Sequence, residues 1–214
     1  TDPSYNGQIL VITYPLIGNY GIPPKTLEHD LLKYFESDRI RVRGLVISDY
    51  SKEHTHWNAV QSLDEWMQEQ KIPGIYNVDT RMITRRLREK GTMLGTLTPQ
   101  GENVLTPSDP NLTDLAGEVC IKEPKLYAKG KKKVVVVDCG VKNNIIQAFL
   151  RRDISVLRVP HDWDFSGEEA EGIVLSNGPG DPKICRKTIE QTRTVMRRNM
   201  PILGICLGSQ ILGL

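Results

Sequence analysis

The chain shows two different patterns of hydrophobic and polar residues, and the change falls near residue 130. After it, short apolar runs are separated by amphipathic stretches. The run from Val134 to Val137 is continuously apolar, which is typical of a strand buried on both faces. Further strands are expected at 155–159, 172–175 and 202–205, and helices at 143–152 and 183–198. Strands that alternate with helices predict a parallel, doubly wound α/β sheet.

Before residue 130, shorter elements are interrupted by proline, glycine and polar residues. Strands are expected at 8–14 and 42–47, where β-branched residues are frequent, and helices at 26–37, 57–70 and 79–90. The last helix has Asp79 as its candidate N-cap and Gly91 as its stop. Its four arginines are expected to face water, the alternative being a phosphate site. We expect a mixed α/β domain over residues 1–130, a solvated lysine-rich linker over 122–133, and a second domain over 131–214.

Composition narrows the classes of function. Of the 214 residues, 39% are hydrophobic and 25% are charged, close to the average for globular chains. The net charge of +2 does not favour nucleic acid or an anionic membrane as a partner. No apolar run approaches the about 18 residues of a membrane-spanning helix. The four cysteines include no C-x-x-C pair, which disfavours zinc and iron–sulfur sites and leaves a disulfide open.

Cys206 lies where a predicted strand turns into a helix, between Gly204 and Gly208. Such a sharp turn needs small neighbours, and it lifts the side chain above the sheet. A helix N-terminus favours a thiolate, and the backbone N–H of Leu207 is in position to bind an oxyanion. A buried core cysteine is the alternative. The flanking glycines and the strand-end position favour a nucleophile.

The loop at residues 177–182, Asn-Gly-Pro-Gly-Asp-Pro, follows another predicted strand. Gly178 and Gly180 allow the backbone to approach a ligand, and its N–H groups can bind a carbonyl or carboxylate. An ordinary turn is the alternative for the loop taken alone. In doubly wound sheets, ligands bind beyond the carboxyl ends of strands. We therefore expect the loop and Cys206 to form one site.

These segments resemble the class I (triad) glutamine amidotransferases, in the pattern Gly-Ile-Cys-Leu-Gly-x-Gln at 204–210 preceded by Ser-Asn-Gly-Pro-Gly-Asp-Pro at 176–182. Segments at 1–5, 13–21, 78–81 and 137–144 narrow the resemblance to the glutaminase subunit or domain of eukaryotic carbamoyl-phosphate synthetase. The resemblance spans essentially the whole chain. It implies an N-terminal mixed α/β small-subunit domain followed by a doubly wound, flavodoxin-like amidotransferase domain.

The resemblance also implies a reaction and its residues. Cys206 would attack the side-chain amide of L-glutamine, forming a glutamyl thioester and releasing ammonia. Contacts to the substrate or the oxyanion would come from Ser4, Gly178, Gly180, Leu207 and Gln210. Because Ser4 belongs to the first predicted domain, the site is expected between two domains. No metal site is expected.

A synthetase partner follows from the same resemblance. Ammonia would pass to a large subunit or a fused synthetase domain, which makes carbamoyl phosphate from bicarbonate. The chain has no Gly-x-x-x-x-Gly-Lys-Ser/Thr loop, so we expect ATP and Mg in that partner and no cofactor here. A role in pyrimidine, arginine or urea synthesis stays open. Phrases at 49–52 and 90–95 lean toward the arginine- and urea-linked type, and hence toward a mitochondrial rather than a cytoplasmic location.

Three departures from the family pattern limit these expectations. The base of the triad is a histidine oriented by a glutamate two residues later, and both are expected beyond Leu214. Ser209 stands where the family usually has histidine, and the start of the first domain is expected to precede Thr1. We therefore expect a fragment that is inactive alone. The four histidines do not match the motif and are expected at surface or loop positions: His29, His54, His56 and His161.

Two other functions are alternatives to glutamine hydrolysis for carbamoyl-phosphate synthesis. The first is a non-catalytic regulatory or scaffold domain of an ammonia-dependent synthetase, which Cys206 disfavours and Ser209 leaves open. The second is another triad amidotransferase, feeding purine or tryptophan synthesis. The motifs before residue 130 disfavour it, because such enzymes lack a domain in front.

Overall fold

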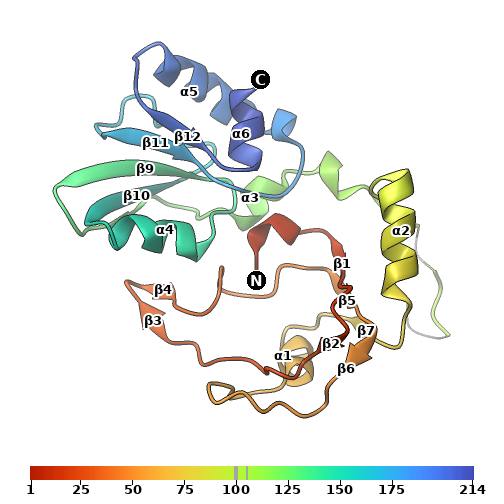
Figure 1. The fold of residues 1–214 in the computed structure, drawn as a ribbon. Coiled ribbons are helices and arrows are strands. Elements are labelled where there is room, and N and C mark those ends of the chain that lie inside the picture. Colours follow the sequence, from red (N-terminus) through yellow and green to blue (C-terminus); the bar gives the residue numbers. More distant parts are fainter. Residues whose placement is uncertain (99–100, 105) are drawn as a thin grey trace. The chain divides into compact units, whose positions relative to one another are not determined.

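A computed structural model describes residues 1–98, 101–104 and 106–214, which form two compact units (Figure 1). Unit 1 comprises Thr1, Gly7–Thr26 and Arg39–Asp109. Unit 2 comprises Asp2–Asn6, Leu27–Asp38 and Pro110–Leu214. Two N-terminal segments therefore belong with the C-terminal half of the chain. Compact units and domains of a family need not coincide, so the domain boundary expected near residue 130 stays a prediction.

Unit 1 is built on a parallel three-stranded sheet in the order β1-β5-β7: β1 (Ile9–Val11), β5 (Gly44–Val46) and β7 (Gly74–Ile75). The strands predicted at 8–14 and 42–47 are confirmed, although both are shorter. Leu45, Ile47 and Met67 form a buried core between this sheet and helix α1 (Leu63–Glu69). A second, two-stranded parallel pair joins β2 (Leu16–Ile17) to β6 (Asp49–Tyr50).

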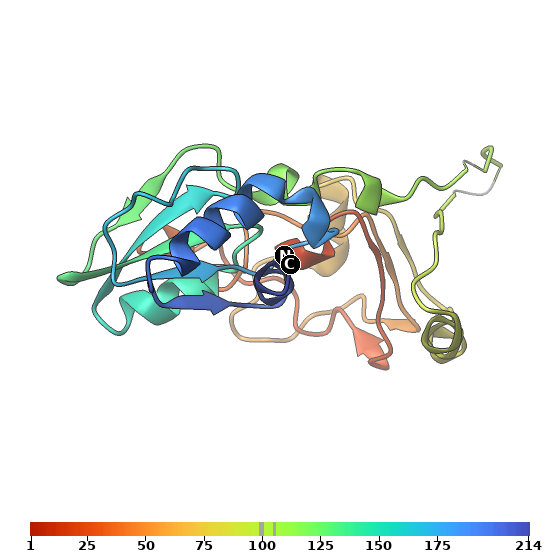
Figure 2. The same ribbon diagram turned by 90° about the horizontal axis from the view of Figure 1, so that it is seen from above.

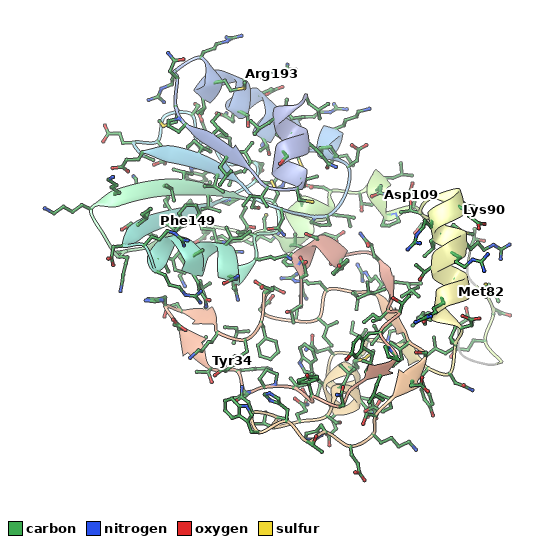
Figure 3. All side chains as sticks on the ribbon, in the orientation of Figure 1. Tyr34, Met82, Lys90, Asp109, Phe149 and Arg193 are labelled. Carbon is green, nitrogen blue, oxygen red and sulfur yellow. The ribbon has the colours of Figure 1, made fainter. Side chains whose placement is uncertain are left out.

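The helices of Unit 1 begin at side-chain caps. In α1 (Leu63–Glu69), Ser62 and Glu65 form a reciprocal capping box, so this helix starts later than the predicted residue 57. In α2 (Thr80–Lys90), Asp79 Oδ1 accepts from the N–H of Met82 at 2.9 Å, and Gly91 ends the helix at φ +82°, as predicted. The arginines of α2 are exposed, and Met82 and Lys90 mark its length in Figure 3.

The helix predicted at 26–37 is wrong. The segment instead forms an antiparallel hairpin of β3 (Leu27–Glu28) and β4 (Leu31–Leu32). Its two turn residues, His29 and Asp30, have φ of +54° and +60°, which no right-handed helix accommodates. Leu31 is buried in the core of Unit 2, so tertiary packing overrides the local helical spacing of apolar residues.

Unit 2 is a five-stranded sheet in the order β12-β11-β9-β10-β8. Its strands are β8 (Lys125–Tyr127), β9 (Lys132–Asp138), β10 (Ile154–Pro160), β11 (Gly172–Leu175) and β12 (Ile202–Gly204). The last four are parallel, as predicted, and β8 is antiparallel to β10. The expectation of a solvated linker over 122–133 is therefore wrong at β8, where Tyr127 is buried.

Helices cover both faces of this sheet, which confirms the doubly wound arrangement (Figure 1). On one face, α4 (Asn143–Leu150) packs Ile146 and Leu150 on Val136, Val156 and Val174. The opposite face carries α5 (Arg186–Met196) and α6 (Leu207–Leu212), and Figure 2 looks onto α5. In Figure 3, Phe149 on α4 and Arg193 on α5 mark the two sides.

The described residues also form the short helices η1 (Pro3–Tyr5), η2 (Pro110–Leu112), α3 (Leu115–Val119) and η3 (Pro182–Ile184). The first, η1, is capped by Asp2, whose Oδ1 accepts from the N–H of Ser4 at 3.0 Å. Within the described ranges, none of the helices has the length and apolar character that a membrane crossing needs.

Candidate active site

Cys206 occupies a strained turn at the carboxyl end of β12. Its backbone has φ +52° and ψ −108°, outside the regions that residues other than glycine normally adopt. The next residue, Leu207, begins α6, and its N–H has no acceptor within its own helix. The Cys206 side chain is exposed. This is the sharp strand-to-helix turn that the sequence predicts, with the thiol at the surface.

The glycines on either side of Cys206 are required by close backbone contacts. A Cβ on Gly204 would lie 2.7 Å from the carbonyl oxygen of Gly208, and a Cβ on Gly208 would lie 2.1 Å from that of Leu175. The N–H of Gly208 also donates to the carbonyl of Ser176 at 3.1 Å. These contacts fasten the turn to the end of β11.

Gly208→Ala is expected to destabilise the turn by about 1–3 kcal/mol, because its Cβ meets a backbone oxygen that cannot move aside. The control is Gly213→Ala, whose Cβ would have its nearest neighbour at 3.4 Å, an ordinary contact. Calorimetric melting of the full-length protein measures both. Equal melting temperatures for the two variants would contradict the expectation.

The structure brings the loop at 177–182 against the Cys206 turn. A Cβ on Gly178 would lie 2.0 Å from the carbonyl oxygen of Cys139 and 2.9 Å from Cδ2 of Leu207. Gly180 has φ +88°, a conformation that glycine adopts without strain. Gly178 therefore packs both on the residue that follows β9 and on the first residue of α6.

Asn177 connects this loop to the N-terminal segment. Its Nδ2 donates to Ser4 Oγ and to the carbonyl of Gly140, both at 2.9 Å, and its Oδ1 accepts from the N–H of Lys142 at 3.3 Å. The side chain of Lys142 pairs with Asp2 at 2.7 Å. These contacts all lie within Unit 2. The same compact unit contains the six predicted site residues, which are Ser4, Gly178, Gly180, Cys206, Leu207 and Gln210.

Asp138 is a second connecting residue, at the end of β9, and it is completely buried. Its Oδ1 accepts from the N–H groups of Gly140 and Val141 at 2.9 and 2.7 Å. Its Oδ2 accepts from the N–H of Ile121 at 2.8 Å and pairs with the Arg158 guanidinium at 2.6 Å. Asp138 thus holds the turn against which Gly178 packs.

The sequence reasoning missed the roles of Asn177 and Asp138. An acidic residue directly after four valines is a signal for Asp138, because a charge at the end of a buried strand needs several partners. For Asn177 the sequence carries no such signal, since its partner Ser4 lies 173 residues away.

The remaining predicted contacts lie on α6. Gln210 is exposed, and its N–H donates to the carbonyl of Cys206 at 3.1 Å. Ser209 donates its hydroxyl to the carbonyl of Gly204 at 2.8 Å. This bond ties the first turn of α6 back to the end of β12.

His161 lies in the turn after β10, in keeping with the expected surface or loop position, but its side chain is buried. Its Nε2 lies 3.3 Å from Asp114 Oδ2. An interaction with Cys185 and the charge of Asp114 raise the pKa of His161 above its usual value, against the effect of burial. The other histidines lie in turns or loops, His29 exposed and His54 and His56 half-buried.

Across residues 1–98, 101–104 and 106–214, no three His, Cys, Asp or Glu side chains are grouped so that they could hold a metal ion.

Two protein families match this chain in succession. Residues 1–97 match the carbamoyl-phosphate synthase small chain, CPSase domain, and residues 135–214 match glutamine amidotransferase class-I. The chain joins a carbamoyl-phosphate synthase small-chain domain to a class-I glutamine amidotransferase domain. Both the fold class and the family expected from the sequence are thereby confirmed.

Several curated relatives match the whole chain. It is 48% identical to multifunctional protein CAD of Squalus acanthias and 46% identical to human carbamoyl-phosphate synthase [ammonia], mitochondrial. It is 43% identical to the carbamoyl phosphate synthase arginine-specific small chain of Saccharomyces cerevisiae. Each match covers 100% of this chain. The chain spans 10%, 14% and 55% of these three relatives.

Proposed function

We propose that this chain is the glutamine-hydrolysing part of a carbamoyl-phosphate synthase, with Cys206 as the nucleophile. The observation that carries the proposal is the exposed thiol on a backbone of φ +52° between two glycines that admit no Cβ. A strained, exposed nucleophile at a strand-to-helix turn is the arrangement that acyl-transfer enzymes use.

The proposed reaction begins with attack of the Cys206 thiolate on the side-chain carbonyl of L-glutamine. The amide nitrogen takes up a proton, the C–N bond breaks and ammonia leaves. Water then hydrolyses the glutamyl thioester to glutamate, which restores the Cys206 thiolate and releases protons to solvent. The N–H of Leu207 and the loop from Gly178 to Gly180 stabilise the oxyanion. Ser4 and Gln210 contact the rest of the substrate.

Ammonia would then pass to a synthetase partner, either a large subunit or a fused domain, that uses ATP and Mg to make carbamoyl phosphate from bicarbonate. The small-chain match over residues 1–97 supports such a partner. The name of the human relative includes a mitochondrial location, which supports the mitochondrial preference from the sequence over a cytoplasmic one.

A glutamine analogue that carries a diazoketone in place of its amide tests the nucleophile directly. In the full-length protein, the analogue should alkylate Cys206 and stop glutamine hydrolysis, and excess glutamine should protect the thiol. Peptide mass mapping locates the adduct. An adduct on another cysteine, with Cys206 unmodified, would overturn the assignment.

The second candidate is a non-catalytic domain of an ammonia-dependent synthetase. The name of the human relative, which includes ammonia, favours it. Ser209 also favours it, because the resemblance drawn from the sequence implies histidine at this position. In that case the analogue would label no cysteine, and glutamine would not support carbamoyl phosphate formation at any concentration.

Asn177→Ala is expected to raise KM for glutamine about 10-fold, the equivalent of one lost positioning hydrogen bond, with a smaller fall in kcat. The reason is that Asn177 holds both Ser4 and the turn at Gly140. Asn144→Ala, the loss of an exposed amide on α4, is the matched control and should leave KM unchanged. Steady-state kinetics measure both variants. An unchanged KM in Asn177→Ala would contradict the positioning role.

A further inference from the structure

Helix α2 carries a concentration of positive charge that the proposed hydrolysis of glutamine does not use. Its 11 residues include four arginines, one lysine and one glutamate, a net charge of +4, whereas the whole chain has a net charge of +2. The rest of the chain is therefore slightly acidic, and the excess of positive charge belongs to this helix. The helix lies within residues 1–97, which match the small-chain domain.

The charges gather on the exposed side of α2 (Figure 3). Thr80 is buried, Ile83 and Leu87 are half-buried, and the helix contacts β1 of the same unit. Because these three residues recur three or four positions apart, they share one side of the helix. The other side is the basic face of α2, on which Glu89 is the single carboxylate beside five exposed cations: Arg81, Arg85, Arg86, Arg88 and Lys90.

No carboxylate of the chain balances these cations. Among residues 1–98, 101–104 and 106–214, none of the five forms an ion pair. Arg81 and Arg85 are four residues apart, as are Arg86 and Lys90, and like charges at this spacing destabilise a helix. Arg81 also lies in the first turn, where the helix dipole favours an anion. Charges that oppose the local preferences of a helix, without compensation nearby, indicate a functional surface.

The layout of the basic face indicates an acidic protein surface. Arg81 and Lys90 are separated by about 13 Å along the helix, so the cations form a row and do not converge on a single phosphate. Met82 is 53% exposed and lies three residues from Arg85 and four from Arg86. Methionine and arginine are both enriched in protein interfaces, and the guanidinium group binds carboxylates in a bidentate manner. The small net charge of the whole chain disfavours a nucleic acid or an anionic membrane.

We propose that the basic face of α2 is the surface on which an acidic surface of the synthetase partner docks. The identity of the partner rests on the proposed function, whereas the place and the chemistry of the contact rest on the charges of α2. The curated relatives extend well beyond the part that this chain matches, since it spans 10%, 14% and 55% of three of them. Complementary charges fix the orientation of two partners and exclude others, so this face would set how the synthetase is held.

Cross-linking with a carbodiimide tests the place of contact, because this reagent joins a lysine amine to a carboxylate only where the two touch. The full-length protein is used, with its partner bound where that is a separate chain, and the products are mapped by mass spectrometry. The expected product joins the peptide that contains Lys90 to a peptide of the synthetase. Its absence would overturn the proposal, and so would a Lys90 cross-link only to residues 1–214 of the same or a second copy. Protection of Lys90 from acetylation by inorganic phosphate, without the cross-link, would identify a phosphate site instead.

The double variant Arg81→Glu/Arg85→Glu tests the charge of the face. A carboxylate suits position 81 in the first turn, and a carboxylate at 85 lies three residues from Arg88, so α2 should be no less stable. The yield of the Lys90 cross-link is nevertheless expected to fall about 10-fold or more, because like charges then face each other across the contact. Lys25→Glu/Lys52→Glu is the matched control, with the same change of charge on exposed lysines of Unit 1, and should keep the yield. Equal yields in the two double variants would overturn docking by charge.

The two double variants also separate docking from hydrolysis. In Arg81→Glu/Arg85→Glu, the carbamoyl phosphate formed per glutamine hydrolysed is expected to fall about 5-fold or more, the lower end of typical coupling between two sites. Added ammonia should still support the normal rate, and the control should keep the original ratio. An unchanged ratio in a variant that has lost the cross-link would overturn the effect on coupling. If the unmodified protein does not hydrolyse glutamine, the proposed function fails and the cross-link still decides where the partner docks.

Discussion

Cys206→Ser is expected to lower glutamine-dependent carbamoyl phosphate formation on the order of 10³-fold or more, the usual cost of removing a catalytic nucleophile. The serine hydroxyl is a far weaker acid than a thiol, so it supplies almost no anionic nucleophile at neutral pH. The substitution is nearly isosteric, and the backbone of the turn at φ +52° is determined by its neighbours Gly204 and Gly208. The change therefore removes reactivity while it keeps the shape of the site.

The measurement compares glutamine and free ammonia as nitrogen sources in the same full-length protein. The ammonia-dependent rate is the internal control, because it bypasses Cys206. Cys120→Ser is the matched variant, since Cys120 is a half-buried thiol in the same unit and should leave both rates intact. A normal glutamine-dependent rate in Cys206→Ser would show that another residue is the nucleophile.

Asp138→Ala is expected to destabilise Unit 2 by about 3–5 kcal/mol, the cost of breaking a buried ion pair from one side. It would leave the half-buried Arg158 guanidinium without its charged partner. It would also remove the acceptor from the N–H groups of Gly140 and Val141, which form the turn under Gly178. Few single substitutions remove as many contacts at once.

Hydrogen exchange of peptides from β9 and β10 measures this effect locally, within the full-length protein. A loss of 3 kcal/mol or more corresponds to exchange faster by about 100-fold or more, since about 1.4 kcal/mol is tenfold. Asp138→Ala combined with Arg158→Met should recover part of the loss, because no unpaired charge then remains. Asp162→Ala is the control, since it breaks an exposed pair with Lys187 and should change little. A double variant as unstable as Asp138→Ala alone would contradict the electrostatic explanation.

The sequence predicts Unit 2 well because its signals are local. Four consecutive valines identify the central strand β9, and the glycines around Cys206 identify the strand-to-helix turn. The predicted strand at 172–175 matches β11 residue for residue. Each of these signals depends on neighbours in the chain, and each is visible without knowledge of the fold.

The parts that could not be predicted depend on residues far apart in the sequence. The apolar residues of the hairpin at 27–32 have helical spacing. Leu31 nevertheless packs in the core of Unit 2, and His29 and Asp30 adopt positive φ. Strand β8 is only three residues long, and its pairing with β10 defines it. The contact between Asn177 and Ser4 likewise exists only in the folded chain.

The division of Unit 2 into segments at 2–6, 27–38 and 110–214 has a consequence for the order of events during synthesis. Domains emerging from the ribosome fold from the N-terminus as units. Here Ser4 cannot form its hydrogen bond with Asn177 until residue 177 has been synthesised. The segment at 2–6 therefore completes its contacts in Unit 2 only after the loop at 177–182 has been made.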